Sequence, residues 1–154
     1  MPGTNLFAPS TIANDTPCLV DENGFDYVTK RVITLTSAQI LALNTTPIQL
    51  VEAHGAGTVV VINKLLAKLV YGSAAYTGAN ALEIRYTDGS GAKATADLPT
   101  SFLNATANAY YKAIEASAAP VENAKVVAVV PTANPGAGNS PIIIEIEYAV
   151  RKLS

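Results

Sequence analysis

The stretch TVVVINKLLAKLVYGSAAYTGANALEIRY, residues 58–86, is the most apolar and most β-branched part of the chain. Residues 58–71 are rich in Val, Ile and Leu, which favours a long strand over a helix. A loop of small residues follows at 72–80. Apolar and charged residues then alternate from Leu82 to Tyr86, as is typical of a half-buried antiparallel strand. We therefore predict a long strand, a loop and a return strand at the centre of an all-β core.

The rest of the sequence predicts further short strands separated by turn residues. They are expected at 28–36, 48–52, 92–96, 109–115, 125–130 and 142–150. A helix of one or two turns is expected at Ser37–Leu43 with Ser37 as its N-cap, and residues 97–107 form a short helix or a loop. Residues 125–130 are apolar on both faces, which indicates a central strand. About seven to nine strands with frequent turn signals predict a β-sandwich or jelly roll.

Residues 1–27 differ from the remainder, because prolines interrupt them and no apolar period persists. We interpret them as an extended N-terminal arm, with residues 28–154 as the β-sandwich domain. A disordered tail is the alternative, but such tails are usually poor in large apolar residues. The large apolar residues expected to pack on another surface, such as a neighbouring subunit, are Leu6, Phe7, Ile12, Leu19, Val20, Phe25 and Tyr27 of the arm, together with Tyr76.

Composition limits the classes of partner. Hydrophobic residues make up 49% of the 154 residues and charged residues 14%, against about 25% charged in typical domains. A net charge of −2 without a basic run argues against nucleic-acid binding. No apolar run reaches the roughly 18 residues of a membrane span. The first residues do not match a signal peptide, so we expect the chain to be made and retained in a cytoplasm.

Residues with reactive side chains are few and scattered. His54 is the only histidine and Cys18 the only cysteine, and neither has partners at the spacing of a metal or nucleophile site. Glu145 and Glu147 share a strand face about 7 Å apart, a distance that glycoside hydrolases use, yet the chain has no Trp to form a sugar platform. We predict that the chain has no catalytic, cofactor-binding or metal-binding residue and that it is not an enzyme.

Four segments of the sequence resemble those of a known group of proteins. They are Ile33–Asn44, Pro47–Gly57, Leu69–Tyr76 and Leu82–Gly91. They are similar to small structural proteins of tailed bacteriophages, described as head decoration, cement or head-fibre proteins. The resemblance covers residues 31–95 well and the last strand loosely, while the arm and residues 97–140 match only in general style.

The resemblance implies a virion protein with no enzymatic activity and no cofactor, located on the capsid surface after assembly in the cytoplasm of a host bacterium. It implies a homotrimer that binds the major capsid protein. The arm and the loops at 72–80 and 131–141 are the expected contacts. The alternative is a fibre or spike domain that binds host-surface glycans through exposed tyrosines, drawn from Tyr71, Tyr76, Tyr86, Tyr110, Tyr111 and Tyr148.

Overall fold

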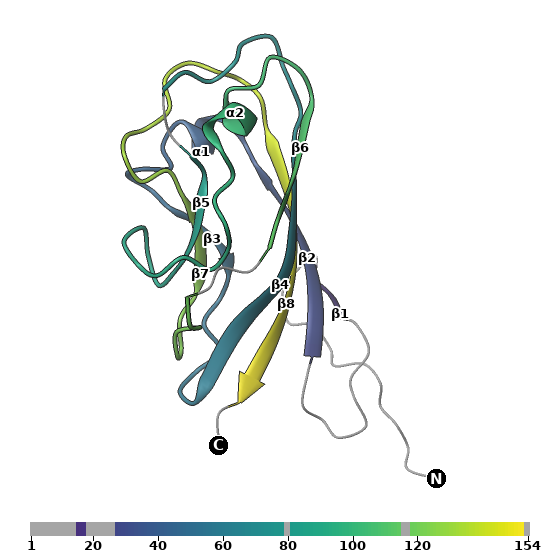
Figure 1. Cartoon of the computed structure of the whole chain (residues 1–154), viewed down its shortest axis with the longest axis vertical. Helices are drawn as coiled ribbons and strands as arrows, with labels where there is room; N and C mark the ends of the chain where they lie inside the picture. Colours follow the sequence, from purple (N-terminus) through teal and green to yellow (C-terminus); the bar gives the residue numbers. More distant parts are fainter. Residues whose placement is uncertain (1–14, 18–26, 79–80, 115–117, 153–154) are drawn as a thin grey trace.

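The computed structural model describes residues 15–17, 27–78, 81–114 and 118–152 (Figure 1). These ranges contain eight strands and two one-turn helices. The strands are β1 (Asp15–Pro17), β2 (Tyr27–Leu35), β3 (Ile48–Val51), β4 (Thr58–Leu69), β5 (Glu83–Tyr86), β6 (Ala109–Ala113), β7 (Val126–Val129) and β8 (Ile142–Lys152). The helices are α1 (Ser37–Ile40) and α2 (Thr100–Leu103).

The described strands form two antiparallel sheets, which confirms the predicted all-β fold. A five-stranded sheet has the order β1-β2-β8-β4-β6, and a three-stranded sheet has the order β3-β7-β5. Figure 1 shows the sheets as two layers, with both helices toward the upper end. β1 falls within the predicted arm, and it joins the larger sheet by pairing with β2 from Asp15↔Arg31 to Pro17↔Thr29.

The stretch 58–86 forms the predicted long strand, β4, but its second strand does not return beside it. β4 pairs with β8 and β6, whereas β5 pairs with β7 in the opposite sheet. The lengths explain this outcome, because the 11 residues of β8 match the 12 of β4, while β5 has four. β5 instead faces β4 across the core, where the Tyr86 hydroxyl donates to the Val60 carbonyl at 2.9 Å.

The core lies between the two sheets. Alternate residues of β8 are buried there as predicted, namely Ile142, Ile144, Ile146 and Tyr148. All four residues of β7 are buried, and β7 lies at the centre of its sheet, which confirms the central strand expected from its apolar sequence. Each fully buried aliphatic side chain contributes roughly 1.5–3 kcal/mol to folding, so these strands account for much of the stability.

Three local predictions need correction or completion. α1 is capped by Thr36 and not by Ser37, because the Thr36 hydroxyl accepts from the Gln39 amide while the Gln39 side chain accepts from the Thr36 amide. The expected strand at 92–96 is absent from the strands described, and this segment makes only isolated bridges such as Arg85↔Lys93. The choice between helix and loop at 97–107 is settled by α2, whose Phe102 and Leu103 are buried.

Candidate functional site

Most of the predicted contact residues lie outside the described residues. They are Leu6, Phe7, Ile12, Leu19, Val20 and Phe25. Tyr27 begins β2, with its backbone opposite Val150. Tyr76 was expected to make a surface contact, but its side chain is only 2% exposed, and its hydroxyl donates to the Ser140 carbonyl at 2.7 Å. A side chain buried in this way fixes the loops from inside and offers no surface to a partner.

The two loops expected to make contacts are joined to one another, and we call residues 70–78 and 131–141 the loop pair. Thr77 and Gly136 form a bridge in which each amide donates to the other's carbonyl, at 2.8 and 2.9 Å. The Thr77 hydroxyl adds a bond to the Gly136 carbonyl at 2.9 Å. The Val70 amide donates to the Pro141 carbonyl at 2.9 Å. Two loops about sixty residues apart in the chain therefore form one surface.

Asn139 ties the loop pair together at its exposed rim. Its Oδ1 accepts from the amides of Ser73 and Ala74 at 2.9 and 3.0 Å, and its Nδ2 donates to the Ser73 hydroxyl at 2.9 Å. Beneath it, Gly138 has a φ of +89°, and a Cβ at this position would lie 2.3 Å from Cδ1 of Tyr76. Only glycine permits this backbone to press against the buried ring.

Further asparagines anchor the loop pair to its surroundings. The side chain of Asn44, just beyond α1, donates to the carbonyls of Val130 and Pro131, both at 2.9 Å. The Asn44 amide donates to Oδ1 of Asn134 at 2.8 Å. On the other side, the Tyr71 amide donates to Oδ1 of Asn108 at 2.8 Å. These bonds hold the loops to the turn after α1 and to the segment before β6, so the surface is positioned before any partner binds.

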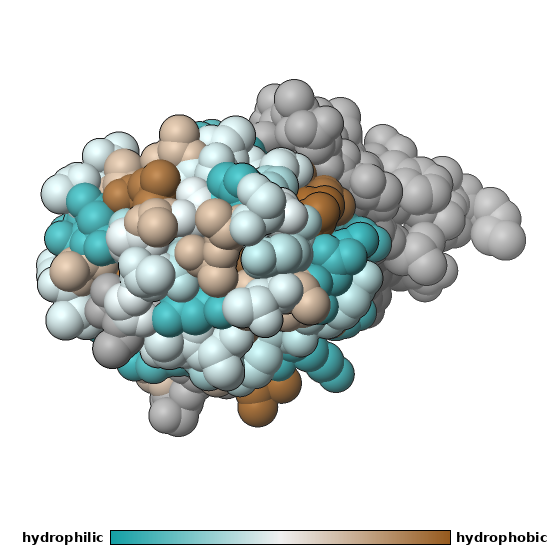
Figure 2. All heavy atoms as spheres, turned by 90° about the horizontal axis from the view of Figure 1, so that it is seen from above, coloured by the Kyte–Doolittle hydropathy of each residue, from teal (hydrophilic) through white to brown (hydrophobic). Residues whose placement is uncertain are grey.

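The loop pair carries no charged residue in either of its segments. Figure 2 looks down on this end of the molecule and shows mostly pale, weakly polar residues, with small areas of strong hydrophobic or hydrophilic colour. Removing water from such a surface costs less than removing it from charged groups. The arrangement is suited to a protein–protein contact.

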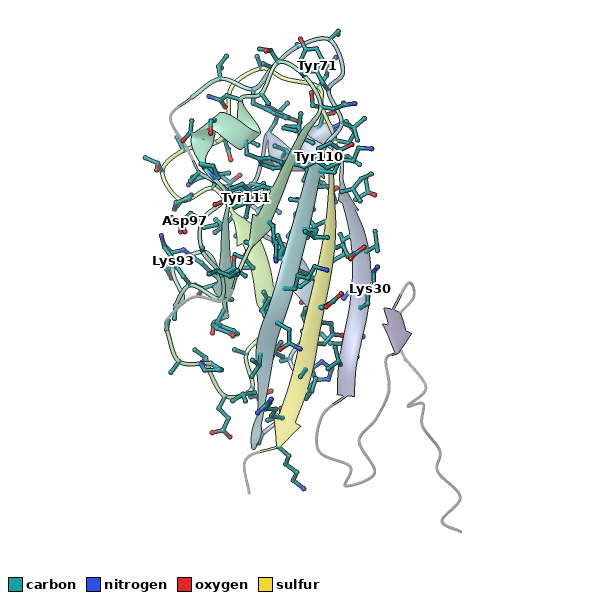
Figure 3. All side chains as sticks on the ribbon, turned by 45° about the vertical axis from the view of Figure 1, so that its right-hand side comes forward. Lys30, Tyr71, Lys93, Asp97, Tyr110 and Tyr111 are labelled. Atoms are coloured by element: carbon teal, nitrogen blue, oxygen red, sulfur yellow. The ribbon has the colours of Figure 1, made fainter. Side chains whose placement is uncertain are left out.

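A second surface lies on the outer face of the five-stranded sheet. A groove of about 480 Å³, here called the outer-face groove, crosses the strands β2, β8, β4 and β6. Its lining includes Val32, Leu66, Tyr110 and Ile143, together with Lys68, Lys112 and Glu145. In Figure 3 this face comes forward: Tyr110 on β6 lies below Tyr71, and Lys30 on β2 lies lower and to the right. The sequence did not single out this groove, because it depends on which strands become neighbours.

A cluster of four charged side chains lies at β5 and the loop after it. Glu83, 7% exposed, pairs with Arg85 and Lys93, and Lys93 also bonds Asp97 at 2.7 Å. The hydrogen bond to Asp97 raises the pKa of Lys93. Arg85 further donates to the Gly91 carbonyl at 2.6 Å. The two carboxylates balance the charges of Arg85 and Lys93. Together these ion pairs hold the loop 87–98 against β5 and so stabilise the fold.

The glutamates considered for hydrolase chemistry are also paired. Glu145 contacts Lys30 at 2.7 Å and Glu147 contacts Lys64 at 3.7 Å. Across the described ranges, no group of three or more His, Cys, Asp or Glu residues is arranged to hold a metal ion. No helix in the same ranges has the length and apolar character to cross a membrane.

The tyrosines proposed for glycan binding do not form one surface. Tyr76, Tyr86 and Tyr148 are buried at 2–3% exposure, whereas Tyr110 is 71% exposed. Tyr111 faces the opposite side of β6 from Tyr110, with its ring centre 6.2 Å from that of Phe102. Tyr110 is thus the most exposed ring of this group, and it borders the outer-face groove.

Comparisons with known proteins give structural likenesses alone. No protein-family model matches the chain, and no curated protein sequence matches it. One similar solved structure is a chain of the capsid of Ralstonia phage GP4, with a TM-score of 0.44, 18% identity, and coverage of 85% of this chain and 87% of that one. Another is a chain of the cyanophage Pam1 capsid asymmetric unit, with a TM-score of 0.47, 16% identity, and coverage of 97% and 99%. Likenesses of this size carry no functional assignment.

Proposed function

We propose that the chain is a non-enzymatic virion structural protein, a decoration or cement subunit that binds the major capsid protein on the surface of a phage head. The observation that carries this proposal is the loop pair, a surface without charge whose two segments are bonded to each other and to the turn after α1. The resemblance of residues 31–95 to head decoration and cement proteins supports the same role.

The rigidity of the loop pair matters energetically. Ordering flexible side chains and loops opposes association by roughly 0.5–1.5 kcal/mol per immobilised side chain. The bonds of Asn139, Asn44 and Tyr76 have already ordered this surface in the free protein. A contact of about 800 Å² per partner then suffices for specific binding. Many copies on one lattice, each assembled as a homotrimer, would multiply the stabilisation of the shell.

The arm of residues 1–27 is the second proposed contact. We expect a chain that begins at residue 28 to fold, because the core lies between strands that start at β2, and to lose capsid binding. A chain that begins at residue 15 is the matched control, since it keeps β1 and its pairing with β2. Equal binding by all three lengths would remove the arm from the proposal.

The loop pair is tested by adding one charge. Ala74 is exposed on the loop pair, and Ala56 is exposed in the turn between β3 and β4 at the other end of the molecule. We expect Ala74→Glu to weaken co-sedimentation with assembled capsids, because a carboxylate must then be desolvated. Ala56→Glu makes the same change away from the loop pair and should bind as the wild type does. Identical binding of the two variants would contradict the role of the loop pair.

The remaining alternative is a fibre or spike domain that binds glycans. Tyr110 is the residue that favours it, since a ring 71% exposed beside a groove is available to stack on a sugar. A glycan array with the purified protein separates the two functions. Hits that disappear in Tyr110→Ala would support the glycan-binding role, and an array without hits would support the capsid role. The homotrimer is checked by measuring the mass of the protein in solution.

A further inference from the structure

Among the described strands, β6 ends the five-stranded sheet, and one of its edges has no described strand beside it; we call this the open edge. Its neighbour among the described strands is β4, paired from Leu65↔Ala113 to Leu69↔Ala109. On its other side, the described contact is at the very end, where the Ala96 amide donates to the Ile114 carbonyl at 3.0 Å. An edge of this kind presents backbone donors and acceptors that an added strand can pair with.

The outward side chains along this edge are unusually exposed. Tyr110 is 71% exposed and Ile114 63% exposed, and Lys112 between them is also exposed. The intervening Tyr111 and Ala113 face the core, with Ala113 1% exposed. Because side chains alternate along a strand, an added strand would place every second side chain beside this row. The row that an added strand would meet consists of a large apolar residue, a cation and a second large apolar residue, namely Tyr110, Lys112 and Ile114.

The charges at the outer-face groove are unbalanced on the β6 side. Glu145 on β8 is paired with Lys30 at 2.7 Å. Lys68 lies 5.5 Å from the ring centre of Tyr110, and no described acidic side chain forms an ion pair with Lys68 or Lys112. The groove floor, formed by Leu66 and Ile143, lies on β4 and β8, across β6 from the edge. Along the edge itself, Lys112 stands between Tyr110 and Ile114, so an occupant with an acidic side chain between apolar ones complements this row.

A second copy of the chain does not supply that pattern. If two β6 strands paired antiparallel with Tyr110 opposite Ile114, each Lys112 would lie opposite the other Lys112, and like charges in that position are destabilising. None of the 12 acidic residues in the sequence has a large apolar residue two positions away on both sides. The complementary segment is therefore expected in a different protein.

We propose that the open edge of β6 binds an extended segment of a different protein by strand addition, with the side-chain pattern large apolar, any, acidic, any, large apolar. The acidic side chain pairs with Lys112, and the apolar ones cover Tyr110 and Ile114. The inference rests on the proposed function in one respect, because it takes the segment to belong to the capsid protein.

Two capped peptides test the edge directly. One has the sequence Thr-Val-Thr-Glu-Thr-Val-Thr, and its control has Lys in place of the central Glu. The full chain, isotope-labelled, is titrated with each, and the backbone amide shifts of residues 109–114 are followed. We expect the wild type to bind the Glu peptide about threefold to tenfold more tightly than the Lys peptide, and Lys112→Glu to reverse the order. Co-sedimentation of the wild type and Lys112→Glu with assembled capsids is the second measurement, in which the variant should bind less.

Each outcome decides one point. Equal binding of the two peptides, or shifts away from β6, overturns strand addition even if capsids are bound. A third variant, Lys112→Thr, removes the charge and tests whether Lys112 only prevents self-pairing of the edge. Aggregation of this variant, together with no preference of the wild type between the two peptides, also overturns strand addition. A clear peptide preference combined with no capsid binding by the wild type rejects the proposed function and leaves the edge as a site for another protein. A peptide preference with equal capsid binding by the wild type and Lys112→Glu removes the capsid protein as the occupant.

Discussion

The loop pair and the edge of β6 differ in how many of their hydrogen-bonding groups already have partners within the described part of the chain. In the loop pair, Asn139 and Tyr76 use their polar atoms on neighbouring loops of the same chain. Along β6, Tyr110 and Lys112 project into solvent, as does Ile114 directly after it, and this strand has a described neighbour on one side only. The first surface is complete before binding, and the second gains backbone bonds through binding. Substitutions in the loop pair should therefore cost stability, and those on the edge should cost binding.

The largest expected effect is at Gly138. Replacing it with Ala would put a Cβ 2.3 Å from Cδ1 of Tyr76 at a φ of +89°, so strain and overlap combine. We expect a loss of about 3–5 kcal/mol in the free energy of unfolding, measured by urea denaturation.

Gly55→Ala is the matched control for Gly138. Gly55 has a φ of +97°, and nothing lies within 4 Å of a Cβ there. This variant carries the backbone strain alone, roughly 1–2 kcal/mol. If the two substitutions cost the same, the packing of the loop pair on Tyr76 contributes nothing to stability.

The next effect is a loss of stability at high pH. Burial raises the pKa of Tyr76 from 10.0 to about 12. In the unfolded chain the phenol ionises near pH 10, while the folded protein keeps its proton, so the contribution of Tyr76 is complete below pH 10 and is lost as the pH rises to 12. The expected loss is about 2–3 kcal/mol. Comparing the wild type with Tyr76→Phe across this range isolates the effect, because other groups titrate equally in both; parallel pH profiles would contradict it.

Asn139→Ala comes third. It removes bonds from the Ser73 and Ala74 amides and one to the Ser73 hydroxyl. Because these groups are exposed and water replaces part of each bond, we expect a loss of about 1–2 kcal/mol. Asn108→Ala removes one bond, from the Tyr71 amide, and should cost less than half as much in the same denaturation experiment. A cost for Asn139→Ala no larger than that of Asn108→Ala would show that the rim is not held by Asn139.

The same comparison explains what the sequence can and cannot predict. The burial pattern of β8 could be predicted because a strand with one buried face has an apolar residue at every second position, as at Ile142, Ile144 and Ile146. The partner of β5 was not readable, since pairing depends on the lengths and registers of strands far apart in the chain. The burial of Tyr76 could not be predicted for the same reason. Its neighbours in the sequence are small residues, and the residues that cover it, Gly138 and Ser140, lie more than sixty positions away.

The two surfaces had different signals in the sequence. The loop pair was signalled in part by Gly136, Gly138 and the uncharged residues around them, which mark a long loop. What the sequence did not contain was the bond between that loop and residues 70–78. The edge of β6 had no signal, because the alternation of Tyr110 to Ile114 is the same in a central strand and in an edge strand. Only the order of the strands makes Lys112 a residue at the margin of the sheet.

The smallest expected effect on stability is at the edge itself. Ile114 is 63% exposed and Ile144 is 0% exposed, so the same replacement by Thr separates surface from core. We expect Ile114→Thr to change the free energy of unfolding by less than about 0.5 kcal/mol, and Ile144→Thr to cost at least about 2 kcal/mol, since it buries a hydroxyl and removes a methyl group. Both are measured by urea denaturation. Under the proposal, Ile114 contacts the added strand, so Ile114→Thr should weaken binding of the Glu peptide while the free energy of unfolding is unchanged. If Ile114→Thr were as destabilising as Ile144→Thr, the edge would be part of the core, and the contrast with the loop pair would fail.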